Sequence, residues 1–124
     1  MLNRSDHGDA SVFLPENLLR ESRRQRGLPM GQVPDVCVLD PDGDIVRYLR
    51  HEHAAEQDAA WACYHTDLWV GCVGGRRIGV VGGAVGAPFA VLVAEELRVC
   101  GCTLLISVTS AGRIADDLPD EGMV

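Results

Sequence analysis

Residues 76–112 of this chain read RRIGVVGGAVGAPFAVLVAEELRVCGCTLLISVTSAG, and this stretch decides the fold. It contains two apolar runs of strand length. Between them lie a glycine-rich loop and an apolar segment of helix length that Pro88 opens and Gly101 closes. We predict a strand at 76–81, the loop at 82–88, a helix at 89–99 and a strand at 103–108. Strand, loop, helix and strand in this order are typical of an α/β sheet.

The residues upstream continue the same alternation of strands and helices. Pro15 and Gly27 delimit a helix that has an acidic residue in its first turn and arginines in its last. Gly74-Gly75 predicts a hairpin between an aromatic-rich strand and the strand at 76–81. We therefore expect a helix at 13–27, strands at 35–40 and 61–70, and a helix from residue 44 to about residue 58.

Length, composition and charge bound the class of protein. The 124 residues suit one domain, and 47% hydrophobic with 23% charged residues is typical of globular proteins. A net charge of −7 argues against binding to nucleic acid. Because no apolar run reaches the length of a membrane span and the N-terminus is polar, we expect a cytoplasmic protein that binds no membrane. We assign residues 1–12 to a disordered tail, 13–115 to the α/β domain and 116–124 to an acidic tail.

Arginine supplies all 11 positive charges, because the chain contains no lysine. Schiff-base chemistry and a phosphate-binding lysine are therefore excluded within this chain. Arg20, Arg23, Arg24 and Arg26 lie within seven residues at the end of the first predicted helix. They form either an anion-binding patch or a solvated helix end that complements the helix dipole, and we favour the second interpretation.

The five cysteines are predicted to be reduced structural thiols. Their odd number and the lack of a secretion signal argue against a disulfide framework. Cys100-Gly-Cys102 has no second Cys/His pair at zinc spacing. We therefore predict no metal site and no organic cofactor.

Three loops follow predicted strands, at residues 40–44, 82–88 and 109–112, where open α/β sheets bind ligands. The glycine loop either cradles a phosphate or makes a tight turn that needs small residues. Gly43 and Arg47 would together grip an oxyanion, although an arginine on a helix is more often a surface residue. Thr109 and Ser110 either donate hydrogen bonds to a phosphate or sugar, or cap the turn.

Taken together, these loops resemble three motifs of the nucleoside phosphorylase family, which includes purine nucleoside phosphorylase, uridine phosphorylase and related nucleosidases. Gly43-Asp44-Ile45-Val46-Arg47 keeps the glycine, aspartate and arginine of the family's Gly-Asp-Pro-x-Arg motif. Residues 82–89, followed by Glu96-Leu97, resemble its glycine-loop signature and the Glu-Leu that ends the next helix. Residues 107–112 stand where the family has Arg-aliphatic-Gly-Ser/Thr-x-Gly.

The resemblance implies a three-layer α/β fold with a mixed sheet, truncated to its N-terminal half. It implies that Gly43, Arg47 and Ser110 bind inorganic phosphate, the co-substrate, and that Gly86 and Thr109 lie near the substrate. The family's reaction is attack of phosphate, or of water in nucleosidases, on the anomeric carbon of a nucleoside, so an active chain would be a pentosyltransferase or a hydrolase. The base-binding groups lie in the second half of family members, and we assign no catalytic acid.

The sequence also departs from the family pattern. Ser107 stands where phosphorolytic members place a second phosphate-gripping arginine. A hydrogen bond to a charged group contributes roughly 1.5–3 kcal/mol, so this loss should weaken phosphate binding by about one to two orders of magnitude. Phe89 and Ala84 replace the usual serine and glycine. Two alternatives to an enzyme therefore remain: a catalytically inactive remnant, and a regulatory module that binds phosphate or a nucleoside without chemistry.

His65 is a further candidate for contact with substrate. We place it on the predicted strand at 61–70, with Asp67 on the same face. There it is either an oriented base or an ordinary strand residue whose hydrogen bonds are satisfied.

The predicted half-fold also bears on assembly. Half of a sheet leaves one edge open and some apolar surface exposed, and both features favour self-association. We therefore predict a homo-oligomer.

Overall fold

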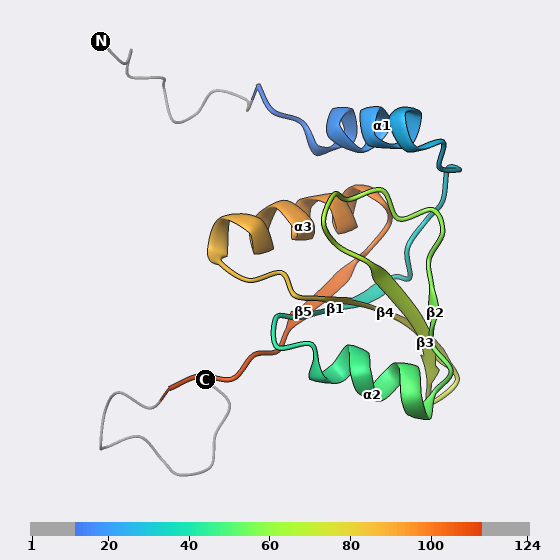
Figure 1. Ribbon diagram of the computed structural model, residues 1–124, viewed down its shortest axis with the longest axis vertical. Coiled ribbons are helices and arrows are strands. Elements are labelled where there is room, and N and C mark those ends of the chain that lie inside the picture. Colours follow the sequence, from blue (N-terminus) through green and yellow to red (C-terminus); the bar gives the residue numbers. More distant parts are fainter. Residues whose placement is uncertain (1–11, 113–124) are drawn as a thin grey trace.

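The computed structural model describes residues 12–112, which contain three helices and five strands (Figure 1). The elements are α1 (Pro15–Arg26), β1 (Val36–Asp40), α2 (Asp44–Glu52), β2 (Glu56–Gln57), β3 (Leu68–Val73), β4 (Arg76–Gly82), α3 (Ala87–Val99) and β5 (Leu104–Ser107). Apart from Val12, the predicted tail at residues 1–12 lies outside the described residues, as does the acidic tail at 116–124.

The strands form one mixed sheet in the order β2-β3-β4-β1-β5. The central strand β1 runs parallel to both of its neighbours, so that Val38 lies between Val80 of β4 and Ile106 of β5. β3 is antiparallel to both β4 and β2. Figure 1 shows α1 and α3 on one face of this sheet and α2 on the other. The predicted three-layer α/β fold with a mixed sheet is confirmed.

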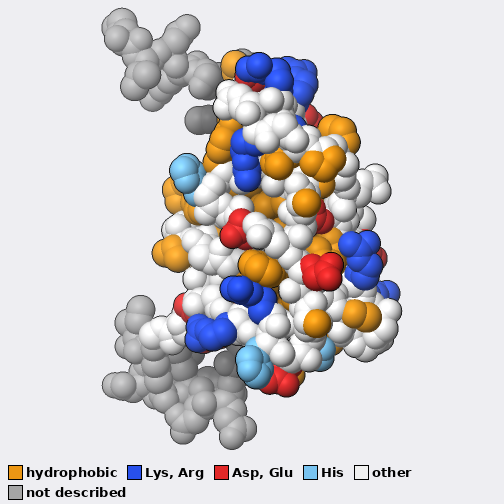
Figure 2. Space-filling model, turned by 45° about the vertical axis from the view of Figure 1, so that its right-hand side comes forward, with side chains coloured by type: hydrophobic (Ala, Val, Ile, Leu, Met, Phe, Trp, Pro, Cys, Tyr) orange, Lys and Arg blue, Asp and Glu red, His pale blue; other side chains and the backbone are white. Residues whose placement is uncertain are grey.

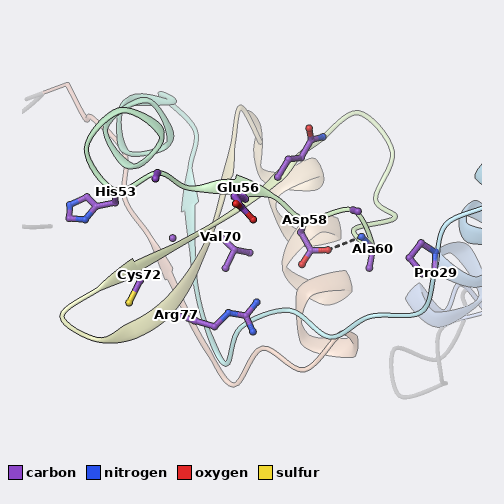
Figure 3. A pocket seen from close by; sticks show the side chains of 12 residues that line it. Pro29, His53, Glu56, Asp58, Ala60, Val70, Cys72 and Arg77 are labelled. Atoms are coloured by element: carbon purple, nitrogen blue, oxygen red, sulfur yellow. Dashed lines mark hydrogen bonds between the residues drawn. The ribbon is translucent and has the colours of Figure 1, made fainter.

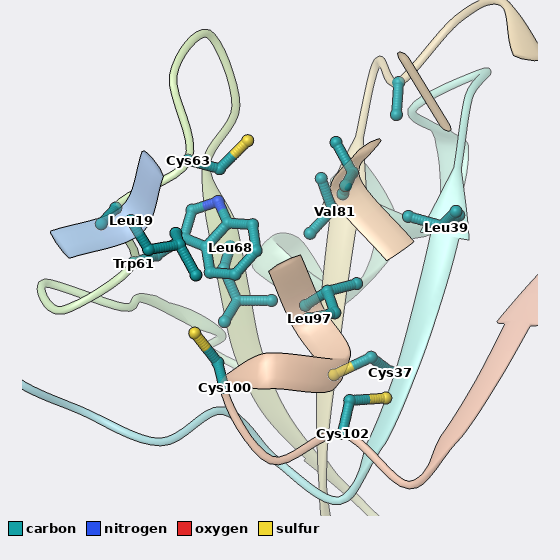
Figure 4. Close-up of a cluster of buried hydrophobic side chains, with 13 residues drawn as sticks. Leu19, Cys37, Leu39, Trp61, Cys63, Leu68, Val81, Leu97, Cys100 and Cys102 are labelled. Atoms are coloured by element: carbon teal, nitrogen blue, oxygen red, sulfur yellow. The ribbon is translucent and has the colours of Figure 1, made fainter. Parts of the chain in front are cut away.

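The main core lies between the sheet and the α1–α3 layer (Figure 4). Leu68 of β3, Val81 of β4 and Leu97 of α3 are completely buried there. Burial of each such side chain contributes roughly 1.5–3 kcal/mol, so this layer supplies most of the hydrophobic stabilisation. The buried set of this core is Leu19, Cys37, Leu39, Trp61, Ala62, Cys63, Leu68, Val81, Ala84, Val93, Leu97, Cys100 and Cys102.

On the opposite face, α2 packs closely over β4 because Gly82 lies beneath it. A Cβ atom on Gly82 would lie 3.1 Å from the Val46 side chain, which is closer than an ordinary contact. The Arg50 guanidinium stacks over the Trp69 ring at 4.1 Å from its centroid. Gly82 therefore lets the helix approach the sheet.

Two predicted elements differ from the structure. The strand predicted at 61–70 begins only at Leu68, and residues 61–67 form a loop. An apolar residue stands at position 61 because the Trp61 side chain is buried in the core, although the residue lies in a loop. Its indole N–H donates to the Thr66 hydroxyl at 2.9 Å. The helix predicted to reach residue 58 ends at Glu52, because Ala54 adopts a left-handed backbone conformation.

The arginines of α1 do more than complement a solvated helix end. Figure 2 shows arginine side chains gathered at the α1 end of the molecule. Arg24 pairs with Glu21 on the helix surface. Arg26, by contrast, reaches the carbonyl oxygens of Ala62 and Cys63 at 3.4 Å, and Arg23 approaches the Cys100 sulfur at 3.4 Å. The favoured interpretation therefore holds for only part of the cluster, because two arginines tie α1 to the layer beneath it.

The five cysteines are free thiols, and four of them are buried. Burial raises the pKa of Cys37 and of Cys63 to about 12, so both stay protonated at neutral pH. The prediction of reduced structural thiols is confirmed for these buried cysteines. Only Cys72 is exposed.

Candidate functional site

The predicted loops that follow β1 and β5 meet at the carboxyl edge of the parallel strands, and the glycine loop begins at the same edge. Asp40 ends β1 directly beside Gly82, the last residue of β4. The Gly83 amide donates to the Asp40 carbonyl at 3.1 Å, and the Ser110 amide donates to Asp42 at 2.7 Å. We call the loops at 40–44 and 108–110 the carboxyl-edge site.

Asp40 organises the first of these loops. Only 2% of Asp40 is exposed, and its two carboxylate oxygens accept the N–H groups of Gly43 at 3.1 Å and Val46 at 2.9 Å. These amides belong to the free N-terminal end of α2, which favours a negative charge. Gly43 has a φ of +79°, a conformation that glycine adopts without strain. Sequence reasoning placed Asp40 at the strand end but gave it no role; an acidic residue just before a helix start is the signal that identifies it.

Arg47 lies one turn into α2, as its spacing from Gly43 predicts. Its guanidinium donates to the Asp44 carboxylate at 2.5 Å, and both side chains are more than two-thirds exposed. Asp44 therefore partly neutralises the cation that the resemblance assigns to phosphate. An exposed pair of this kind contributes little to stability.

Ser110 and Thr109 follow β5 and face the first loop. The Ser110 amide donates to an Asp42 carboxylate oxygen at 2.7 Å, and the Thr109 hydroxyl lies 3.5 Å from the same oxygen. The Val108 amide donates to the Leu39 carbonyl at 3.0 Å, which extends the pairing of β5 with β1 as far as this loop. Sequence reasoning missed Asp42, because nothing in the chain order shows that the two loops touch.

The glycine loop connects β4 to α3 at the same edge. Gly83 and Gly86 both have positive φ, at +72° and +91°, a conformation that glycine adopts without strain. Ala84 is buried in the core, and Phe89 is half-buried against it. The two departures from the family pattern thus serve packing, and the interpretation of this loop as a tight turn accounts for them.

Glu96, which matches the family's Glu-Leu pair, lies away from these loops. It is fully buried in α3 beside the Cys63 thiol and Arg23 of α1. Desolvation raises its pKa, and Cys63 and Arg23 lower the pKa only in part. This residue therefore has a packing role between α3 and α1.

The placement of His65 on a strand is wrong. It lies in a turn with a φ of +66° and is exposed to solvent, its ring 6.3 Å from that of Tyr64. Asp67 instead accepts a hydrogen bond from the Gln57 side chain at 2.8 Å. The apolar residues at 61–63 suggested a strand, but they reach the core from a loop, so alternation does not apply here. The role of His65 as a substrate contact stays a prediction.

A cavity of about 560 Å³ lies at the opposite end of the sheet (Figure 3). Val70, Cys72 and Arg77 line one side, next to the hairpin turn at 74–75, and residues 53, 54 and 56–60 line the other. Asp58 there accepts the Ala60 amide at 2.8 Å. None of the residues predicted from the sequence as site residues lines this cavity. Within residues 12–112, no three His, Cys, Asp or Glu side chains are grouped so that they could hold a metal ion.

Comparison with known proteins assigns the fold to a class. No family model matches the chain, and no curated protein matches it. Among solved structures, uridine phosphorylase from Vibrio fischeri ES114 superimposes on 74% of this chain and 38% of its own, with a TM-score of 0.58 and 26% identity. The structure of the same enzyme complexed with 6-hydroxy-1-naphthoic acid superimposes with a TM-score of 0.59 and 24% identity, covering 77% of this chain and 42% of that one. The chain therefore has a nucleoside phosphorylase-like fold, and it spans about two-fifths of the length of these neighbours.

Proposed function

We propose that this chain carries the phosphate-binding part of a nucleoside phosphorylase-like enzyme. The observation that carries the proposal is the meeting of the loops with Gly43, Arg47 and Ser110 at one sheet edge, in a fold shared with uridine phosphorylase. In this proposal these three residues bind inorganic phosphate, and Gly86 and Thr109 lie near the nucleoside. No organic cofactor is required.

The proposed reaction cleaves the N-glycosidic bond of a nucleoside. An oxygen of phosphate, or of water, forms a bond to the anomeric carbon while the bond from that carbon to the base nitrogen breaks. The base takes the electron pair and a proton, and the product is a sugar phosphate or a free sugar. Charge-assisted hydrogen bonds from Arg47 and the Ser110 amide would orient the phosphate.

A second candidate function is a binding module without chemistry. It is favoured by Ser107, which stands where phosphorolytic members of the resembled family place a second phosphate-gripping arginine. Phosphorolysis of inosine and uridine separates the two candidates. Turnover by the purified chain supports the enzyme. A rise in melting temperature with phosphate, without turnover, supports the binding module. Neither turnover nor a melting shift would contradict both.

Assembly and location are parts of the same proposal. Among residues 12–112, β5 pairs only with β1, and Leu104 and Ile106 of β5 and the following Val108 are about half exposed. We propose that the chain self-associates through this edge in the cytoplasm. No helix in the described part of the chain is long and apolar enough to cross a membrane. Sedimentation velocity of the wild type and of Ile106→Lys tests the assembly: we expect a dimer or larger species that the lysine disrupts, and a monomeric wild type would contradict it.

A further inference from the structure

Asp42 is not among the site residues that the sequence predicts, yet it touches the proposed phosphate site directly. Its carboxylate oxygen accepts the Ser110 amide at 2.7 Å and lies 3.5 Å from the Thr109 hydroxyl. Both donors belong to the loop after β5, although Asp42 itself lies in the loop after β1. A carboxylate oxygen and a phosphate oxygen make the same kind of hydrogen bond with a backbone amide. Asp42 therefore occupies the position on Ser110 that a phosphate oxygen would need.

The other donors of the carboxyl-edge site are also engaged by carboxylates. The Gly43 amide donates to Asp40, both to its side chain and to its carbonyl, at 3.1 Å. The Arg47 guanidinium pairs with Asp44 at 2.5 Å. Of the three carboxylates, Asp40 is buried and also binds Val46, so it belongs to the start of α2. Asp44 is exposed and its ion pair is weak.

We propose that Asp42 is a specificity-determining residue that disfavours inorganic phosphate at the carboxyl-edge site. This proposal rests on the proposed function, because it takes the Ser110 amide to be a phosphate ligand. Phosphate reaches that amide only after displacing Asp42. The displaced carboxylate then lies beside a phosphate that is itself negative, and the two repel each other. Water, the other nucleophile of the proposed reaction, is neutral. It therefore needs no displacement of Asp42 and is not repelled by the carboxylate.

Neutralising Asp42 tests the proposal. Asp42→Asn keeps the size of the side chain and removes the charge, and Asp42→Ala removes the acceptor as well. We expect both variants to bind phosphate at least about 10-fold more tightly than the wild type, as measured by isothermal titration calorimetry. Two variants are used because either one could disturb folding, which circular dichroism detects. The matched control is Asp35→Asn, which removes the same charge from an exposed residue just before the other end of β1 and should leave the dissociation constant unchanged.

The outcomes separate this proposal from the proposed function. Equal phosphate affinity in the wild type and the Asp42 variants overturns the role of Asp42 and leaves the phosphate site standing. A gain in affinity that Asp35→Asn reproduces overturns it too, because net charge alone would then explain the change. A gain specific to Asp42 that Arg47→Ala does not reduce supports the role of Asp42 but contradicts a phosphorylase-like site. No phosphate binding by any variant overturns both.

Discussion

Asp40 at the carboxyl edge and Glu96 beneath α1 are both buried carboxyl groups, yet their surroundings differ completely. Asp40 accepts two backbone N–H groups at the positive end of α2. Both Glu96 oxygens are buried without a hydrogen-bond partner that meets ordinary geometry, and burial raises the pKa of Glu96. At Asp40, two N–H donors offset the loss of solvation that a carboxylate suffers on burial, whereas no such donor does so at Glu96. The sheet edge therefore offers hydrogen-bond donors to a negative charge, and the core around Glu96 does not.

The largest expected effect comes from removing the edge carboxylate. Asp40→Ala removes the carboxylate that accepts the Gly43 and Val46 amides at the start of α2, and the Gly43 amide keeps only its bond to the Asp40 carbonyl. Because hydrogen bonds to charged groups contribute roughly 1.5–3 kcal/mol each and add incompletely, we expect a loss of about 2–4 kcal/mol in the free energy of unfolding by urea. Asp40→Asn retains one acceptor oxygen and should lose less. A loss below about 0.5 kcal/mol for Asp40→Ala would contradict the claim that the amide donors stabilise the buried Asp40 carboxylate.

Glu96→Gln is expected to raise the free energy of unfolding at neutral pH, whereas Asp40→Ala lowers it. Because the pKa of Glu96 in the folded chain lies above its ordinary value of 4.5, the folded chain retains a proton that the unfolded chain releases. This contribution is fully present below about pH 4.5 and is lost as the pH rises through the folded pKa. Each unit of upward shift corresponds to about 1.4 kcal/mol.

The measurement for this variant is urea unfolding between pH 4 and pH 8. The free energy of unfolding of the wild type, relative to that of Glu96→Gln, should fall as the pH rises. The glutamine variant is therefore the more stable of the two at pH 7. A difference that is constant with pH would show that Glu96 is not perturbed by burial.

The smallest expected effect concerns a neutral hydrogen bond between the chain neighbours of Arg23 and Cys63, the two residues that interact with Glu96. The buried Ser22 hydroxyl donates to the Ala62 carbonyl at 2.5 Å and joins α1 to the loop at 61–67. A neutral bond of this kind contributes about 1 kcal/mol, so Ser22→Ala should lower the free energy of unfolding by that amount at every pH. A pH-dependent loss would instead link this bond to the ionisation of Glu96.

The sequence predicted the α/β class, the hairpin and the glycine loop, because these depend on local signals. Pro15, Gly27 and Pro88 mark helix ends through their own backbone preferences. The loop at 61–67 was mistaken for a strand because Trp61 is buried by tertiary packing, which no local pattern reveals.

The candidate site could be predicted only in part. Gly43 and Arg47 follow from spacing within one loop and helix. The contact of Asp42 with Ser110 joins residues that are 68 positions apart and arises from the pairing of β5 with β1. The sequence therefore identifies the donors of the site but not the carboxylates that occupy them.

The central claim is that the carboxyl edge, rather than the cavity at the other end of the sheet, binds phosphate. Backbone amide shifts of the ¹⁵N-labelled wild-type chain, recorded while sodium phosphate replaces sodium chloride at constant ionic strength, test this claim directly and detect weak binding. We expect saturable shifts at Gly43, Arg47 and Ser110 and none at Cys72 or Arg77. Shifts at Cys72 and Arg77 with unchanged carboxyl-edge amides would contradict the claim.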